Sequence, residues 1–138
     1  MTDKITLKKF IEIIIEDRQI NKTELADRIG MSNVQLSRSI NGSMTFATFE
    51  KIMKALDSPV VFLMDKITYH HTDCKMLYLF LKLNAKLTGG QMKHIAPGLY
   101  SLRSGKNISM KTLFKYYKHT EKDLCFEFKN QPFFIDVN

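Results

Sequence analysis

In the first 65 positions apolar residues recur at spacings of three and four, the pattern of amphipathic helices. The spacing predicts one helix over 6–18, a second that begins after Asn21 and a third that begins after Ser32. A fourth begins after Thr45 and ends at Asp57-Ser58-Pro59, because proline cannot continue a helix. Asn, Ser and Thr are typical N-caps, since their side-chain oxygens accept from free backbone N–H groups. The expected inner faces are formed by Leu7, Phe10, Ile11, Ile14, Ile15, Leu25, Ala26, Ile29, Leu36, Ile40, Phe46, Phe49, Ile52, Met53 and Leu56.

Two short segments favour strands. Residues 60–64 are rich in β-branched and aromatic residues, and residues 124–128 alternate between apolar and other side chains. Unpaired edge strands invite aggregation, so we expect the two segments to pair. Pairing within one chain would imitate a dimer, whereas pairing between chains would make a homodimer, and the sequence leaves both open. Residues 130–138 are expected to form a tail that packs down on the fold.

The second half also contains helical patterns, separated by glycine and proline. The spacing predicts a helix over 73–83 and another that begins after Ser109. Between them lie the pairs Gly89-Gly90 and Pro97-Gly98, which are typical of turns.

Residues 22–41 meet the requirements of a helix-turn-helix, in which one helix braces a second whose outer face enters the major groove of DNA. Ala26 supplies a small side chain where the two helices cross, and Gly30, four residues later, permits the turn. The residues expected to fix the pair on the core are Leu25, Ile29, Met31 and Leu36.

This motif resembles the Cro/C1-type repressors, the XRE family of lambda-repressor-like DNA-binding domains. The resemblance rests on residues 22–32, then Leu36-Ser37-Arg38 and Asn41-Gly42, and covers about residues 5–65. It implies a mainly α-helical fold, a lambda-repressor-like helix-turn-helix bundle. Ser39 departs from the family, which usually has an apolar core residue there, so we expect Ile40 to supply the packing.

The resemblance also implies roles for single residues. On the recognition helix Asn33 would pair with adenine, Arg38 with guanine, and Val34 would meet a thymine methyl group. Gln35 is a further candidate for base contact. Contacts to DNA phosphates are implied for Asn21, Lys22, Asn41 and Ser43. Ser43 stands where the family often has a basic residue.

The two halves of the chain align at an offset near 64. Residues 39–42, 45–51 and 60–62 correspond to residues 103–105, 109–115 and 124–126. Each half shows a small helix, a glycine turn, a capped amphipathic helix and a strand, which indicates a diverged internal duplication. We therefore expect a helix-turn-helix domain over 1–66 and a basic, diverged second copy over 67–138. The alternative is a small helical subdomain that only packs against the first.

Charge distinguishes the two halves. The net charge is +7 with a pI near 9.4. Residues 1–65 carry nine Lys/Arg and nine Asp/Glu, whereas residues 66–138 carry twelve and five. This excess suits a polyanion partner. The candidate DNA contacts of the second copy are Lys93, Arg103, Lys106 and Lys111, with Lys82, Lys86, Lys115 and Lys118 as further phosphate-facing lysines.

Other classes of protein find little support. No apolar run approaches the ~20 residues of a membrane span, and the start of the chain lacks the apolar core of a signal peptide, so we expect a cytoplasmic protein without a membrane partner. Cys74 and Cys125 are expected to be free buried thiols. His70 and His71, near Asp73 and Cys74, are not expected to bind a metal, because adjacent histidines point apart. No nucleophile–base arrangement or phosphate loop indicates an enzyme or a cofactor.

The sequence thus predicts sequence-specific binding of double-stranded DNA by a transcriptional repressor of phage, plasmid or mobile-element type, which would act by covering a promoter. The alternative is an antitoxin-like or other protein-interaction module on the same fold, for which exposed Tyr and Phe residues after position 114 would serve. The operator, an effector, the DNA contacts of residues 67–138 and the oligomeric state stay open.

Overall fold

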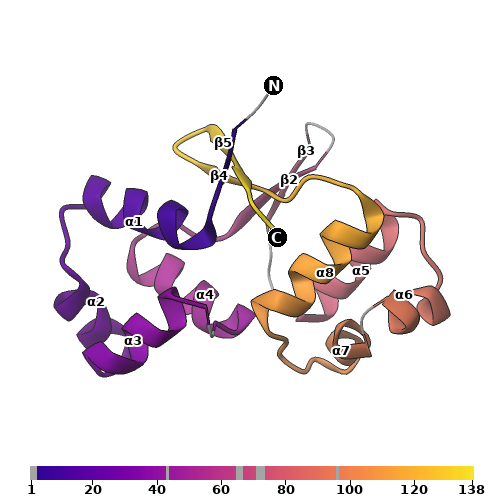
Figure 1. The fold of residues 1–138 in the computed structure, drawn as a ribbon, viewed down its shortest axis with the longest axis horizontal. Helices are drawn as coiled ribbons and strands as arrows, with labels where there is room; N and C mark the ends of the chain where they lie inside the picture. The colour runs from indigo at the N-terminus through magenta and orange to yellow at the C-terminus, as the bar shows by residue number, and fades with distance from the viewer. Residues whose placement is uncertain (1–2, 43, 65–66, 71–73, 96) are drawn as a thin grey trace.

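The computed structural model describes residues 3–42, 44–64, 67–70, 74–95 and 97–138. Two groups of helices lie side by side, and one small sheet lies across the same end of both (Figure 1). We call the helices of residues 7–55 the first lobe and those of residues 74–120 the second lobe. The expected domain boundary falls at residue 66, which lies outside the described residues.

The first lobe contains α1 (Leu7–Asp17), α2 (Lys22–Ile29), α3 (Asn33–Ile40) and α4 (Phe46–Ala55). Each helix begins at a polar cap whose side-chain oxygen accepts from the backbone N–H three residues on; the caps are Thr6, Asn21, Ser32 and Thr45. These are the starts that the sequence predicts. A mainly helical fold is confirmed.

The second lobe contains α5 (Cys74–Asn84), α6 (Gly89–Ile95), α7 (Pro97–Tyr100), the 3₁₀ helix η1 (Ser101–Ser104) and α8 (Met110–Thr120). The pair Gly89-Gly90, which is typical of a turn, in fact begins α6. Thr88 makes this possible, because its hydroxyl accepts from the Gln91 N–H at 3.2 Å while the Gln91 amide oxygen accepts from the Thr88 N–H at 2.8 Å. This reciprocal cap satisfies donors that a helix start otherwise leaves open.

The sheet has five strands in the order β1-β5-β4-β2-β3. They are β1 (Lys4–Ile5), β2 (Val61–Met64), β3 (Ile67–His70), β4 (Cys125–Phe128) and β5 (Gln131–Ile135). Strands β2 and β4 are antiparallel neighbours, with Phe62 opposite Phe126. The prediction of a tail over 130–138 is wrong, because residues 131–135 form the strand β5. This strand pairs with β4 along its length and with β1 at its end.

The position of β2 and β4 bears on the two alternatives for the oligomer. Strand β2 bonds to β3 and β4, and β4 bonds to β2 and β5, all within one chain. Within the described residues neither strand therefore has a free edge, which favours pairing within one chain over the homodimer through 60–64 and 124–128.

One hydrophobic core extends through both lobes. Phe126 of β4 lies at its centre: its ring centroid is 5.7 Å from that of Phe10, 5.1 Å from that of Phe49 and 5.1 Å from that of Phe62. Phe62 in turn lies 5.2 Å from Phe80 of α5. The first lobe, the sheet and the second lobe are thus joined by contacts between aromatic rings.

A second connection joins the starts of α4 and α8. The Phe46 N–H donates to the Ile108 carbonyl, and the Met110 N–H donates to the Met44 carbonyl, both at 2.8 Å. Thr45 and Ser109, the caps of these helices, face each other across this antiparallel bridge. The lobes therefore meet along a seam with backbone hydrogen bonds as well as an apolar core.

Candidate nucleic-acid interface

The turn between α2 and α3 has the geometry that the motif requires. Gly30 ends α2 with φ 71°, a left-handed conformation that costs glycine little, and its N–H donates to the Ala26 carbonyl. Leu25 and Ala26 are buried. The bracing helix is thereby fixed on the core and ended at a defined residue.

Helix α3 begins with a capping box. The Ser32 hydroxyl accepts from the Gln35 N–H at 3.1 Å, and the Gln35 amide oxygen accepts from the Ser32 N–H at 2.9 Å. At the start of α2, by contrast, the Glu24 carboxylate accepts from Arg28 at 3.0 Å. The inner face of α3 is formed by Leu36, Ser39 and Ile40, all buried.

The outer face of α3 carries the predicted base contacts. Asn33, Val34, Gln35 and Arg38 are all exposed, and Val34 is 60% exposed although apolar. Asn33 donates weakly to the Thr23 hydroxyl of α2, at 3.4 Å. The amide oxygen of Gln35 is occupied by the capping box, which leaves its NH₂ group as the available donor.

The predicted phosphate contacts lie at the two ends of the motif. The Asn21 side chain accepts from the Glu24 N–H at 2.8 Å, and Lys22 lies 3.7 Å from the Glu12 carboxylate. Asn41 donates from its side chain to the Ser37 carbonyl at 2.8 Å. Ser43 lies outside the described residues. The N–H groups in the first turn of α2 lack partners within the helix, as at any helix start.

Comparison with known families identifies this site. Residues 11–59 match the family model of the Cro/C1-type HTH DNA-binding domain, a stretch that includes α2, the turn and α3. This part of the chain is a Cro/C1-type helix-turn-helix DNA-binding domain. The family resemblance seen in the sequence is confirmed. Neither curated proteins nor solved structures gave a significant match.

The second lobe lies beyond the matched Cro/C1-type domain and differs from it in charge. Residues 74–120 contain nine Lys/Arg and no Asp/Glu. Two of the predicted contacts gather at Tyr100, because Lys93 and Arg103 lie over its ring at 5.8 and 5.4 Å and Arg103 also donates to its hydroxyl. Lys106 is exposed after the Gly105 turn, and Lys111 lies in the first turn of α8.

At the offset of 64 in the sequence alignment, the segment of α7 and η1 stands opposite α3, but the spacing before it differs. Residues 30–32 separate α2 from α3, whereas one residue separates α6 from α7. Helix α7 has four residues and continues as the 3₁₀ helix η1. Both α3 and α7 lie at the end of the molecule opposite the sheet (Figure 1).

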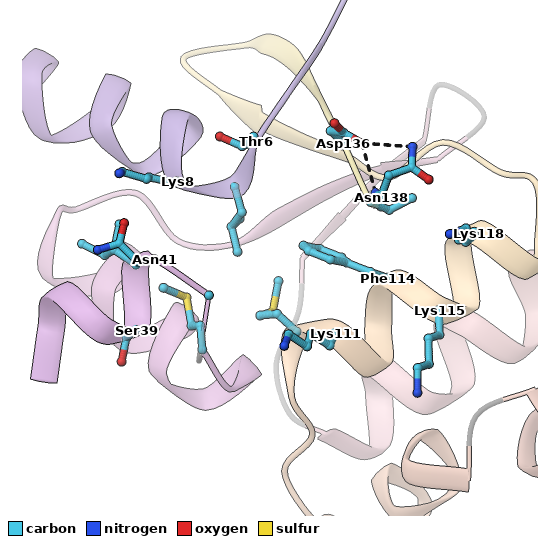
Figure 2. Close-up of a pocket in the computed structure, with 16 residues that line it drawn as sticks. Thr6, Lys8, Ser39, Asn41, Lys111, Phe114, Lys115, Lys118, Asp136 and Asn138 are labelled. Carbon is cyan, nitrogen blue, oxygen red and sulfur yellow. Dashed lines mark hydrogen bonds between the residues drawn. The ribbon is translucent and has the colours of Figure 1, made fainter.

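A cleft of about 570 Å³ lies where the Cro/C1-type domain meets the second lobe. Figure 2 shows α8 on one side of it, and the end of α3 and the start of α1 on the other. Sequence reasoning missed this site, since its walls come from segments far apart in the chain. The lining residues are Thr6, Leu7, Lys8, Ser39, Ile40, Asn41, Gly42, Met44, Met110, Lys111, Phe114, Lys115, Lys118, Asp136, Val137 and Asn138.

Two other classes of site find no support among the described residues. Among them, no group of three His, Cys, Asp or Glu residues is placed to hold a metal ion. No helix in the described ranges has the length and apolar character to cross a membrane.

Proposed function

We propose that the chain is a sequence-specific transcriptional repressor in which α3 enters the major groove of double-stranded DNA. The observation that carries this proposal is the outer face of α3. Asn33, Val34 and Arg38 are exposed there, on a helix whose opposite face is fixed in the core. Hydrogen-bonding and apolar side chains at these positions suit direct contact with base edges.

We further propose that one chain imitates the dimer on which helix-turn-helix repressors usually rely, with two copies divided near residues 66 and 67. Support comes from two antiparallel contacts, Phe62 with Phe126 and Thr45 with Ser109. Each joins residues that are 64 positions apart, the offset at which the sequence aligns with itself. Antiparallel contact between equivalent residues is what a two-fold relation between copies requires.

In this proposal the two copies have different tasks. The short α7 and η1 present little regular helix to a groove, whereas the charge of the second lobe suits phosphates. Lys93, Arg103, Lys106 and Lys111 would hold the DNA backbone beside the half-site bound by α3. Such contacts depend on salt and not on sequence.

Selection of binding duplexes from a random pool tests the proposal. We expect one enriched half-site with a flanking segment of unrestricted sequence, and loss of the preference at one base pair in the Arg38→Ala variant. Enrichment of two equal half-sites would contradict the division of tasks. No enrichment at all would contradict sequence-specific binding.

A protein-interaction module, such as an antitoxin, is the second candidate. The aromatic residues expected to be exposed for it are mostly core: Tyr116, Tyr117, Phe126 and Phe128 are buried. The exposed apolar side chains that could contact a partner lie instead on α5, where Leu79 is 47% and Leu83 71% exposed. If this candidate holds, the double variant Leu79→Ser/Leu83→Ser loses a partner that co-purifies with the chain from its own cells but keeps its DNA affinity.

A further inference from the structure

The cleft at the seam combines an apolar interior with a cationic border. Apolar side chains come from both lobes, among them Ile40 and Met44 on one side and Met110 and Phe114 on the other. Lys8, Lys111, Lys115 and Lys118 also line it, and Figure 2 shows three of them along α8.

One acidic side chain of the lining opposes this charge. Asp136 accepts through Oδ1 from the backbone and side-chain nitrogens of Asn138, at 3.0 and 3.2 Å. Two donors thus already occupy that oxygen. Four lysine side chains against one acidic side chain leave the side chains of the lining net positive.

We propose that this cleft binds a small amphipathic anion, a molecule with an apolar chain or ring and one carboxylate or phosphate group. Its volume of about 570 Å³ falls in the range of small-molecule sites, roughly 300–1,000 Å³. The apolar part would lie against Phe114 and the methionines, which are adaptable in shape. The anionic group would lie at the lysines, where a cation or a neutral chain would gain nothing.

The chemistry of the cleft is particular to one side of the seam. At the offset of 64, Lys111, Phe114 and Lys115 of α8 correspond to Ala47, Glu50 and Lys51 of α4. The equivalent face of the first lobe therefore lacks the aromatic wall and one cation, and it carries an acidic side chain. If the cleft were only a consequence of how the two lobes pack, we would expect similar side chains on the equivalent faces of α4 and α8.

The position of the cleft links it to DNA binding, and this part of the inference rests on the proposed function. Asn41 and Lys111, two proposed phosphate contacts, both line it. An anion in the cleft would compete with a DNA phosphate for them, directly after the last turn of α3. Because such linkage is reciprocal, DNA would weaken the binding of the anion by the same factor as the anion weakens the binding of DNA.

Calorimetry on the full chain without DNA tests the site. The probes are decanoate and decyl phosphate below their micelle concentrations, with decyltrimethylammonium as the cationic counterpart. We expect one anion bound per chain, no binding of the cation, and affinity about tenfold lower in Lys115→Glu. Lys51→Glu is the matched control, because it makes the same charge reversal at the equivalent position outside the cleft, and it should bind like the wild type.

The variant Phe114→Ser distinguishes a cleft ligand from an ion held at surface lysines. It should weaken decanoate about tenfold and leave the weak binding of inorganic phosphate unchanged. The proposal would be overturned if neither anionic probe bound or if the cation bound equally well. It would also be overturned if Lys51→Glu and Lys115→Glu lost the same affinity. The tighter of the two anionic probes identifies the preferred head group.

The link to DNA is measured separately, by fluorescence anisotropy of a labelled duplex with and without saturating decanoate. We expect lower DNA affinity with decanoate in the wild type and no change in Lys115→Glu. Unchanged DNA affinity in the wild type would overturn the regulatory link alone. Absence of DNA binding would contradict the proposed function, while the calorimetry would still decide the site.

Discussion

The two lobes have the same order of helices but differ where a helix-turn-helix acts. In the first lobe, Gly30 and the capping box of Ser32 give α3 a defined start and eight residues of regular helix. In the second, the corresponding segment is four residues of α7 followed by η1. The capped helix and the strand that follow are present in both, as α4 with β2 and α8 with β4. If the lobes are two copies, as proposed, the elements that hold them together have changed less than the element proposed to contact bases.

The two lobes also differ in their charged residues. The first lobe carries charges of both signs, whereas residues 74–120 contain no Asp or Glu. A surface that must distinguish bases needs specific donors and acceptors in register with them, but a surface that holds phosphates needs only positive charge. We therefore interpret the second lobe as a former helix-turn-helix that has kept its place at the DNA and changed its task.

The largest expected effect comes from the core that the lobes share. Phe126→Ala should lower the free energy of unfolding by about 3–5 kcal/mol, because it leaves a cavity among Phe10, Phe49 and Phe62. Thermal unfolding followed by circular dichroism should show one transition at lower temperature for both lobes together. Two separate transitions would show that the lobes fold independently and would break the comparison.

Alkaline pH should weaken the second lobe through Tyr116. Burial raises its pKa from 10.0 to about 12, an effect that the hydrogen bond with Asn84 partly offsets. Below pH 10 the residue is neutral in both states and its contribution is complete. Between pH 10 and 12 the unfolded chain ionises more readily than the folded protein, so stability on the order of 2 kcal/mol is lost across this window.

The equivalent position in the first lobe is Ile52, which is equally buried and does not titrate. Chemical denaturation at pH 9, 10 and 11 should therefore show a smaller loss for Tyr116→Phe than for the wild type. That variant starts from lower stability at pH 7, because the hydroxyl donates to the Leu81 carbonyl at 2.5 Å. Parallel pH curves for the two proteins would contradict this account.

Substitution of one arginine in each lobe should affect DNA binding in different ways. Arg38→Ala should lower affinity for the selected duplex by about 1–3 kcal/mol and relax the preference at one base pair. Arg103→Ala should cost less and should cost the same on every sequence. Anisotropy on the selected and on scrambled duplexes measures both, and an Arg103→Ala effect confined to the selected duplex would mean that the second lobe also contacts bases.

The smallest effects are expected at two glycines. Gly30→Ala should destabilise the fold by about 1 kcal/mol, because φ is 71° there although the space around the residue is open. Gly90→Ala, inside α6 with only Thr88 nearby at 3.9 Å, should stabilise the fold by about 0.5–1 kcal/mol. Urea denaturation compares them, and effects of the same sign would show that the two glycines have similar roles.

Local signals in the sequence were sufficient for most of the first lobe. Caps such as Asn21 and Ser32 and the turn at Gly30 act within a few residues, so the helices of the Cro/C1-type domain and the strand at 61–64 could be predicted. The segment from 85 to 105 could not, because its glycine and proline residues are locally typical of turns, whereas the helix after Ser109 and the strand near 124–128 were predicted. The cap at Thr88 allows the pair Gly89-Gly90 to begin α6 and not a turn.

Contacts between distant residues account for the remaining misses. Strand β5 has few β-formers at its start, and it is a strand because β4 and β1 bond to it on either side. The cleft joins the end of α3 to α8 and the end of the chain, a juxtaposition that only the fold creates. The acid-free run from 74 to 120 was visible in the sequence and would have located the positive lobe more closely.

The central claim is that the first lobe contacts bases and the second contacts phosphates. Its most direct test is the salt dependence of DNA affinity for the variant Arg103→Gln/Lys106→Gln/Lys111→Gln, on selected and on random duplexes. The account predicts equal losses on both duplexes and a slope of log affinity against log salt that is shallower by about 0.9 per lost contact. Neutralising Lys9, Lys51 and Lys54 of the first lobe should leave the slope unchanged. An unchanged slope in the second-lobe variant, or a loss equal to that of the control, would contradict the account.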